Sequence, residues 1–173
     1  MARQGRPRRR VKVATLLAVG EGPADRAFIN HLKGLYSHDS GQKVTVDTAD
    51  GGSPAVMIQH VIRKYRYADY DRRLLLLDED IPIDADALKN ARQGNIELII
   101  SKPVCLEGML LCVLGQQIPN GANADHCKAT LYPQLAGKPT DRNSYGQLFP
   151  RPVIDGTDKP EVVRLRKIVS NEH

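Results

Sequence analysis

A chain of 173 residues with 41% hydrophobic residues is long enough to bury one sizeable core and leaves little room for a second domain. No apolar run approaches the ~20 residues that a membrane helix needs, and the first residues lack the apolar segment of a secretory signal. We therefore expect a cytoplasmic protein with no membrane partner, and the formal net charge of +5 favours a phosphate-bearing one.

Apolar runs and helical patterns alternate along the first two thirds of the chain. In order, we expect a strand over 11–19, a helix from Pro23, a strand over 43–48, a helix from Pro54 to about Tyr67, a strand over 74–77, a helix from Asp84 to Gly94, a strand over 96–100 and an apolar helix over 106–114. This alternation predicts an α/β, Rossmann-like fold with a central four-stranded parallel sheet and helices on both faces.

The last third has weaker patterns. We expect a helix over 122–135 that Pro133 closes, a long surface excursion over 137–158, and a final helix that Asp158 caps and Pro160 begins. The chain thus divides into a basic flexible arm (1–10), a core (11–115), and a helical and loop extension packed on that core (116–173).

Basic residues gather in three places, of which the last is Arg164, Arg166 and Lys167 near the end of the chain. Arg8, Arg9 and Arg10 belong to the arm, and Arg63, Lys64 and Arg66 interleave with Tyr65 and Tyr67. Such clusters suit the backbone of DNA or RNA. The alternatives are a disordered arm and the solvated face of an amphipathic helix.

The three cysteines, Cys105, Cys112 and Cys127, are an odd number without close pairing. We interpret them as buried thiols rather than disulfide partners. A zinc site that also includes His126 is the alternative.

Acidic residues follow two of the expected strands. Glu21 comes just after the first strand, with Asp25 four residues later, and Asp78 and Asp80 come just after the third. If these strands are neighbours, the carboxylates meet beyond their carboxyl ends, where open α/β sheets form their functional crevice. Hard oxygen ligands suit Mg²⁺ or Mn²⁺. The alternative is a set of helix caps and solvated turns, which is how we interpret Asp84 and Asp86.

Three segments carry a resemblance to a known family. Leu16–Gly22 reads LLAVGEG, Asp78–Asp80 reads DED and Ser101–Glu107 reads SKPVCLE. In this order they resemble the Toprim domain, and within it the RloB-like branch found beside bacterial restriction and phage-defence genes. The resemblance spans roughly residues 11–115.

The resemblance implies which residues form the site. Glu21, Asp78 and Asp80 match the Toprim signature. Asp25, Lys102 and Glu107 match further positions of the related overcoming-lysogenization-defect nucleases. The chain departs from the RloB-like pattern at two points: Gly108 stands where a large aromatic residue is usual, and Lys-Pro-Val-Cys replaces Asn-Pro-Cys.

The implied function is a Mg²⁺- or Mn²⁺-dependent nuclease acting on DNA or RNA, as a phage-defence effector. Glu21 would act as general acid or base, Asp78 and Asp80 as metal ligands, Lys102 would steady the phosphate, and Glu107 completes the expected catalytic set. Other partners that this function allows are an ATPase subunit and a second copy of the chain.

Two other functions stay open. The fold can serve as a non-catalytic nucleic-acid- or partner-binding subunit of a defence complex. Gly51-Gly52-Ser53, at the start of a helix, can also form a phosphate nest in a nucleotide-binding regulator.

Overall fold

Four parallel strands form one sheet in the order β2-β1-β3-β4, in a computed structural model that describes residues 12–172. The strands are β1 (Ala14–Gly20), β2 (Gln42–Thr48), β3 (Arg72–Asp78) and β4 (Ile96–Ser101). Each pairs in parallel with its neighbour in the sheet. The predicted α/β class and four-stranded parallel sheet are therefore confirmed.

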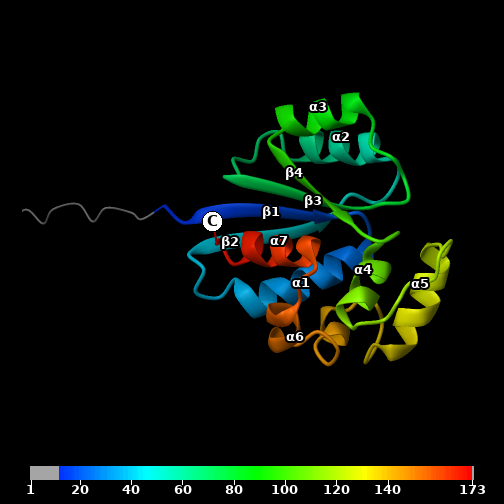
Figure 1. The fold of residues 1–173 in the computed structure, drawn as a ribbon. Helices are drawn as coiled ribbons and strands as arrows, with labels where there is room; N and C mark the ends of the chain where they lie inside the picture. Colours follow the sequence, from blue (N-terminus) through cyan, green and yellow to red (C-terminus); the bar gives the residue numbers. More distant parts are fainter. Residues whose placement is uncertain (1–11, 173) are drawn as a thin grey trace, which may run out of the picture.

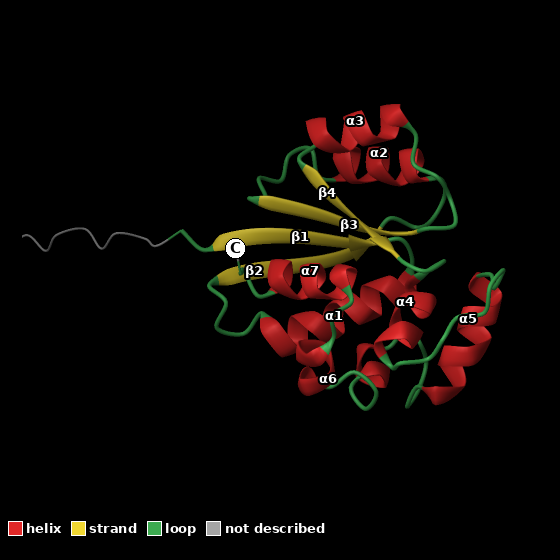
Figure 2. Ribbon diagram, in the orientation of Figure 1, coloured by secondary structure: helices red, strands yellow, loops and turns green. Residues whose placement is uncertain are grey.

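Helices cover both faces of this sheet (Figure 1). The helices are α1 (Pro23–Tyr36), α2 (Pro54–Lys64), α3 (Ala85–Gln93), α4 (Leu106–Val113), α5 (Ala124–Leu131), α6 (Arg151–Gly156) and α7 (Pro160–Val169), with 3₁₀ turns η1 (Tyr132–Gln134) and η2 (Arg142–Tyr145). Helices α2 and α3 lie on one face, and α1, α4, α6 and α7 lie on the other (Figure 2). Helix α5 extends beyond the carboxyl ends of the strands.

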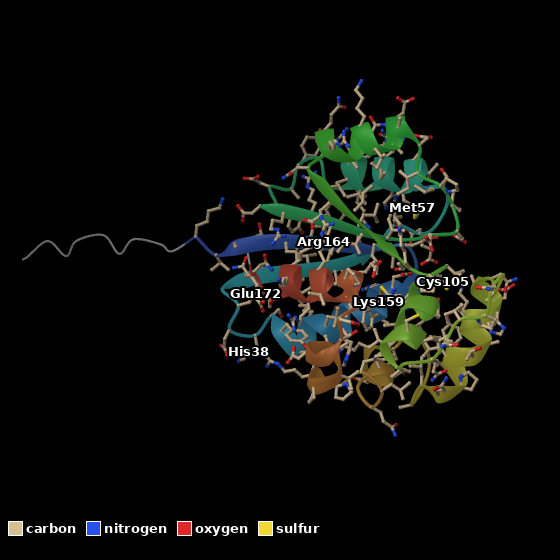
Figure 3. All side chains as sticks on the ribbon, in the orientation of Figure 1. His38, Met57, Cys105, Lys159, Arg164 and Glu172 are labelled. Carbon is tan, nitrogen blue, oxygen red and sulfur yellow. The ribbon has the colours of Figure 1, made fainter. Side chains whose placement is uncertain are left out.

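Strand residues alternate between two separate cores. Leu16 and Ala18 of β1 face the larger core, with α1, α4 and the C-terminal helices, and Leu17 and Val19 face the smaller core under α2 and α3. Met57 of α2 lies in this second layer, between the helix and the sheet (Figure 3). Burial on both faces explains why the strands read as continuous apolar runs.

The segment over 137–158 is not a surface excursion, so this expectation was wrong. Tyr145, Phe149 and Ile154 are fully buried in the larger core, and the segment contains η2 and α6. Tyr145 and Phe149 pack edge-on or tilted around Phe28 of α1. The frequent Pro, Gly and Asn residues indicated an exposed loop, but a few large aromatic side chains pack the segment against α1.

Two helix boundaries also differ from those expected. Helix α2 ends at Lys64 rather than near Tyr67, because the turn after it is held by the Arg73 side chain, which donates to the carbonyl oxygens of Tyr65 and Ala68. The expected helix over 122–135 is α5 alone, with Pro133 inside η1. Asp158 does not cap α7, whose N-cap is Lys159 without a side-chain hydrogen bond.

The final helix returns to the start of β2. The Gln42 side chain donates to the carbonyl oxygen of Ile168, and Asn171 donates to that of Ser40. Among the described helices, none combines the length and apolar character that a membrane span requires. The basic arm predicted over 1–10 lies outside the described residues.

Candidate functional site

The carboxyl ends of β1 and β3 meet where the direction of the sheet order reverses. β2 and β3 lie on opposite sides of β1, and α1 and α2 leave on opposite faces. A pocket of about 550 Å³ opens here. Its lining includes Glu21, Asp25, Asp50, Asp78, Glu107, Lys128, Tyr132 and Thr140. The switch point of an open α/β sheet is where such folds place their ligands.

Three carboxyl groups of this pocket are each fixed by a backbone N–H. The Asp78 N–H donates to Glu21 Oε2 at 3.1 Å, and the Leu106 N–H donates to Asp78 Oδ1 at 2.9 Å. The Gly22 N–H donates to Asp25 Oδ2 at 3.0 Å. Each contact holds one oxygen of its carboxyl group in place.

Gly20 brings Asp25 close to the end of β1. A Cβ atom at Gly20 would lie 2.5 Å from Asp25 Cβ and 2.8 Å from the backbone nitrogen of Arg26. Only glycine therefore lets the first turn of α1 pack directly against the strand end. The Asp25 side chain is 7% exposed, and its Oδ1 is buried without a hydrogen-bond partner among the described residues.

The pKa values of these groups are raised. Burial, and then the charge of Asp78, raises the pKa of Asp25 to about 8. Burial, and then the charge of Glu21, raises the pKa of Asp78 to about 7. Burial also raises the pKa of Glu21, against the lowering effect of its hydrogen bond from Asp78. The carboxylates repel one another in a partly desolvated pocket, and such a pocket favours the binding of a cation.

Glu107 lies at the back of the pocket, in the first turn of α4, and is 3% exposed. The Tyr132 hydroxyl donates to Glu107 Oε1, and burial together with this contact raises the pKa of the tyrosine. Lys128 also lines the pocket, where its charge acts on Glu21. Sequence reasoning placed Glu107 but missed Lys128, Tyr132 and Thr140, which come from segments without a clear pattern.

Asp80 lies at the rim rather than in the carboxylate pocket. It is exposed and lines a neighbouring pocket of about 480 Å³, together with Glu79, Asn123 and Asp125. Its charge still raises the pKa of Glu21 and of Asp78.

Lys102 does not line the carboxylate pocket. Its ammonium group lies 4.0 Å from the Glu79 carboxylate, which also accepts from the Val104 N–H at 3.0 Å. The Glu79 backbone N–H donates in turn to the Val104 carbonyl oxygen. Val104 has φ +67°, an unfavourable conformation for a β-branched residue, and Glu79 holds it there. Glu79 therefore fixes the loop at Val104. Two residues further along, the Leu106 N–H donates to Asp78.

Gly108 leaves no space for the aromatic residue usual at this position in the RloB-like pattern. A Cβ atom there would lie 2.2 Å from the carbonyl oxygen of Pro103 and 3.3 Å from Cys127 Sγ. Cys105, at the start of α4 near the carboxyl end of the sheet, and Cys127 are buried, and Cys112 is half-buried (Figure 3). All three are free thiols, and His126 is exposed.

A divalent cation fits the chemistry of the pocket but requires side-chain movement. Within residues 12–172, no group of three or more His, Cys, Asp or Glu side chains is arranged so that it could hold a metal ion. The donor set nevertheless suits a hard cation, because Asp25 Oδ1 is unpartnered and three carboxyl groups repel one another in one pocket.

Arg63, in the last turn of α2, and Arg66, in the turn after it, lie toward the other end of the sheet. Arg73, near the start of β3, donates to the carbonyl oxygens of Tyr65 and Ala68 in that turn. The Lys64 side chain instead pairs with Asp47, the penultimate residue of β2, at 2.6 Å. The sequence did not predict that Arg66 and the carboxylates of Glu21 and Asp78 would lie at opposite ends of the strands. Arg8, Arg9 and Arg10 lie outside the described residues.

The fold and the pocket together define an α/β protein with an acidic site at the topological switch point of a parallel sheet. Comparisons with protein-family models, with curated proteins and with solved structures gave no match.

Proposed function

We propose that the chain is a Mg²⁺-dependent nuclease of the Toprim kind that hydrolyses phosphodiester bonds of DNA or RNA, as an effector in phage defence. One observation carries the proposal: three carboxyl groups from two strand ends and one helix line a single pocket, with raised pKa values and one buried oxygen unpartnered. The motifs around Glu21, Asp78 and Glu107 add the resemblance to Toprim proteins.

Glu21, Asp25 and Asp78 are the residues that would hold the ion, with Asp80 at the rim of the pocket. When bound, Mg²⁺ or Mn²⁺ would neutralise the negative charge that develops on a phosphodiester in the transition state. Backbone N–H groups hold one oxygen of each of the three inner carboxyl groups, and the ion would bind through the other oxygens.

Glu21 is the residue we propose for proton transfer. Its raised pKa brings the carboxyl group nearer to neutral pH, where an acid or base works best. Lys128, rather than Lys102, is placed to contact a phosphate, because it lines the same pocket. Glu107 and Tyr132 form the inner wall and fix one another.

The test is a cleavage panel of plasmid, single-stranded DNA and tRNA with Mg²⁺ and with Mn²⁺. We expect wild type and Asp86→Ala to cut at least one substrate, since Asp86 is exposed on α3. Asp78→Ala should lose the activity. Cleavage that survives in Asp78→Ala, or absence of cleavage in wild type, counts against the proposal.

A second candidate is a non-catalytic subunit that binds nucleic acid or a partner such as an ATPase. The observation in its favour is that the described carboxylates do not already form a metal-binding group. A chain that binds nucleic acid equally well in chelator and never cuts it belongs to this class.

A further inference from the structure

The molecule has opposite charges at the two ends of its sheet. The carboxyl end carries Glu21, Asp25, Asp50, Asp78, Glu79, Asp80, Glu107 and Asp125 around the two pockets described above. The amino end of the sheet lies at the opposite end of the strands in Figure 2. It carries Lys12, Arg63, Arg66, Arg72, Arg73 and Arg92, and also the acidic residues Asp71 and Glu97. Five residues of β3 separate Arg72 from Asp78, and the two ends are about 20 Å apart along the strand.

Arg73 links the two turns that carry basic residues at the amino end. Arg73 donates to the carbonyl oxygens of Tyr65 and Ala68 after α2, and also to that of Gly94 after α3. The turns after both helices therefore lie side by side at the start of β3. We call this surface the basic end and define it by Arg63, Arg66, Tyr67, Arg72 and Arg92.

The basic end has charge that the described part of the chain does not neutralise. Among the described residues, Arg63, Arg66 and Arg92 form no ion pair, whereas Lys12 and Lys64 are paired with Asp71 and Asp47. Arg72 pairs with Glu97 through Nη2 at 3.5 Å, but its buried Nη1 has no hydrogen-bond partner there. Arg72, Arg73 and Arg92 line one pocket of about 350 Å³ together with Asp71 and Glu97, which pair with Lys12 and Arg72.

An exposed aromatic residue completes the surface. The Tyr67 side chain is 88% exposed, and the Arg66 guanidinium lies 4.5 Å from the centre of its ring. No packing requirement explains so exposed a tyrosine. An exposed aromatic ring beside an unpaired arginine suits a single-stranded nucleic acid, because a base can stack on the ring and a phosphate can contact the guanidinium group.

We propose that the basic end is a binding surface for single-stranded nucleic acid, separate from the carboxylate pocket at the opposite end of the sheet. Binding here does not need a metal ion. A strand held at the basic end must extend about 20 Å or more to reach the carboxylates of the same chain, so binding and cleavage are separable functions of this protein.

The test is fluorescence anisotropy of a labelled oligo(dT) of about 20 nucleotides, in EDTA, titrated with full-length protein over a range of salt concentrations. The double variant Arg63→Gln/Arg66→Gln removes two exposed charges from the basic end. The matched control, Lys138→Gln/Arg142→Gln, removes two exposed charges from the loop that also carries Thr140 of the carboxylate pocket.

We expect the basic-end double variant to bind roughly tenfold more weakly and with a smaller salt dependence, because fewer phosphates are neutralised. The loss is partial because the arginines of residues 1–10 remain in every variant. The control should bind within about twofold of wild type. Equal weakening of both double variants, or no weakening of either, overturns the proposal.

Tyr67→Ala tests the stacking. We expect at least about fivefold weaker binding of oligo(dT) and little change for a duplex of the same length, since paired bases cannot stack on the ring. An equal effect on both ligands contradicts the proposal. Every titration is in EDTA, so binding is measured without the metal ion that cleavage needs. A chain that binds in this way but cuts nothing in the cleavage panel with Mg²⁺ and Mn²⁺ disproves the nuclease proposal and leaves this inference standing.

Discussion

Glu21 and Asp78 are joined across 57 residues of sequence, because the Asp78 N–H donates to the Glu21 carboxylate at 3.1 Å. This hydrogen bond links the end of β1 to the end of β3. It places the first acidic residue of the Toprim-like motif against the backbone of the second. The two strand ends are therefore linked through the Glu21 side chain and the Asp78 backbone.

Asp25 should make the stability of the protein depend on pH. Its pKa is about 8 in the folded protein and 3.8 as the ordinary value, so between these values the folded protein keeps a proton that the unfolded chain has released. The stabilisation is fully present below the ordinary pKa and is lost as the pH rises through the folded one. The slope is roughly 1.4 kcal/mol per pH unit for one proton.

We therefore expect Asp25→Asn to flatten the fall in the free energy of unfolding between about pH 5 and about pH 8, measured by urea unfolding in EDTA. Asp86→Asn, at an exposed position of α3, is the control and should leave the slope unchanged. The same slope in wild type and Asp25→Asn would show that the carboxyl group titrates normally.

Tyr132→Phe should destabilise the protein by about 1–3 kcal/mol, because it removes the hydroxyl that donates to the buried Glu107. Chemical unfolding measures this loss. Tyr67→Phe removes a hydroxyl from a side chain that is 88% exposed and should stay within about 0.5 kcal/mol of wild type. Equal stability of all three proteins would mean that the Tyr132–Glu107 contact contributes nothing.

Ile154→Ala tests the anchoring of the C-terminal segment. Ile154 of α6 is fully buried in the larger core, so truncation should cost about 2–5 kcal/mol. Ile81→Ala makes the same change at a side chain that is 41% exposed and should cost less than about 0.5 kcal/mol. Thermal or urea unfolding compares the two, and a negligible effect of Ile154→Ala would place the segment outside the core.

Two glycines should respond to alanine with opposite signs. Gly34→Ala, within α1, meets no atom within 4 Å and should stabilise by up to about 1 kcal/mol through helix propensity. Gly108→Ala would place its Cβ 2.2 Å from the Pro103 carbonyl oxygen and should destabilise by about 1–3 kcal/mol. A stabilised Gly108→Ala protein would contradict the close contact between α4 and the loop before it.

The strand ends were predictable from the sequence, and the rest of the pocket was not. Glu21 and Asp78 follow continuous apolar runs, and in a parallel sheet such ends share one edge. Lys128 and Tyr132 lie on α5 and η1, short segments without a periodic apolar pattern. Their position depends on how α5 packs on α4, which only the assembled tertiary structure determines.

Local hydrogen bonds explain why Asp80 and Lys102 differ from expectation. Alternation along an extended chain predicted that Asp78 and Asp80 point the same way, but the chain turns directly after β3. Glu79 then bonds to the Val104 backbone, and Lys102 lies beside Glu79 instead of in the pocket. Such a contact across 25 residues has no signature in a single sequence.

Mn²⁺ binding tests the central claim most directly, because it asks whether these carboxyl groups hold a divalent cation at all. Electron paramagnetic resonance of free Mn²⁺, titrated with protein, should show one bound ion per chain in wild type and in Asp86→Asn. In Asp78→Asn we expect the affinity to fall by more than about tenfold. Identical titrations of wild type and Asp78→Asn, or no binding by wild type, would contradict the account.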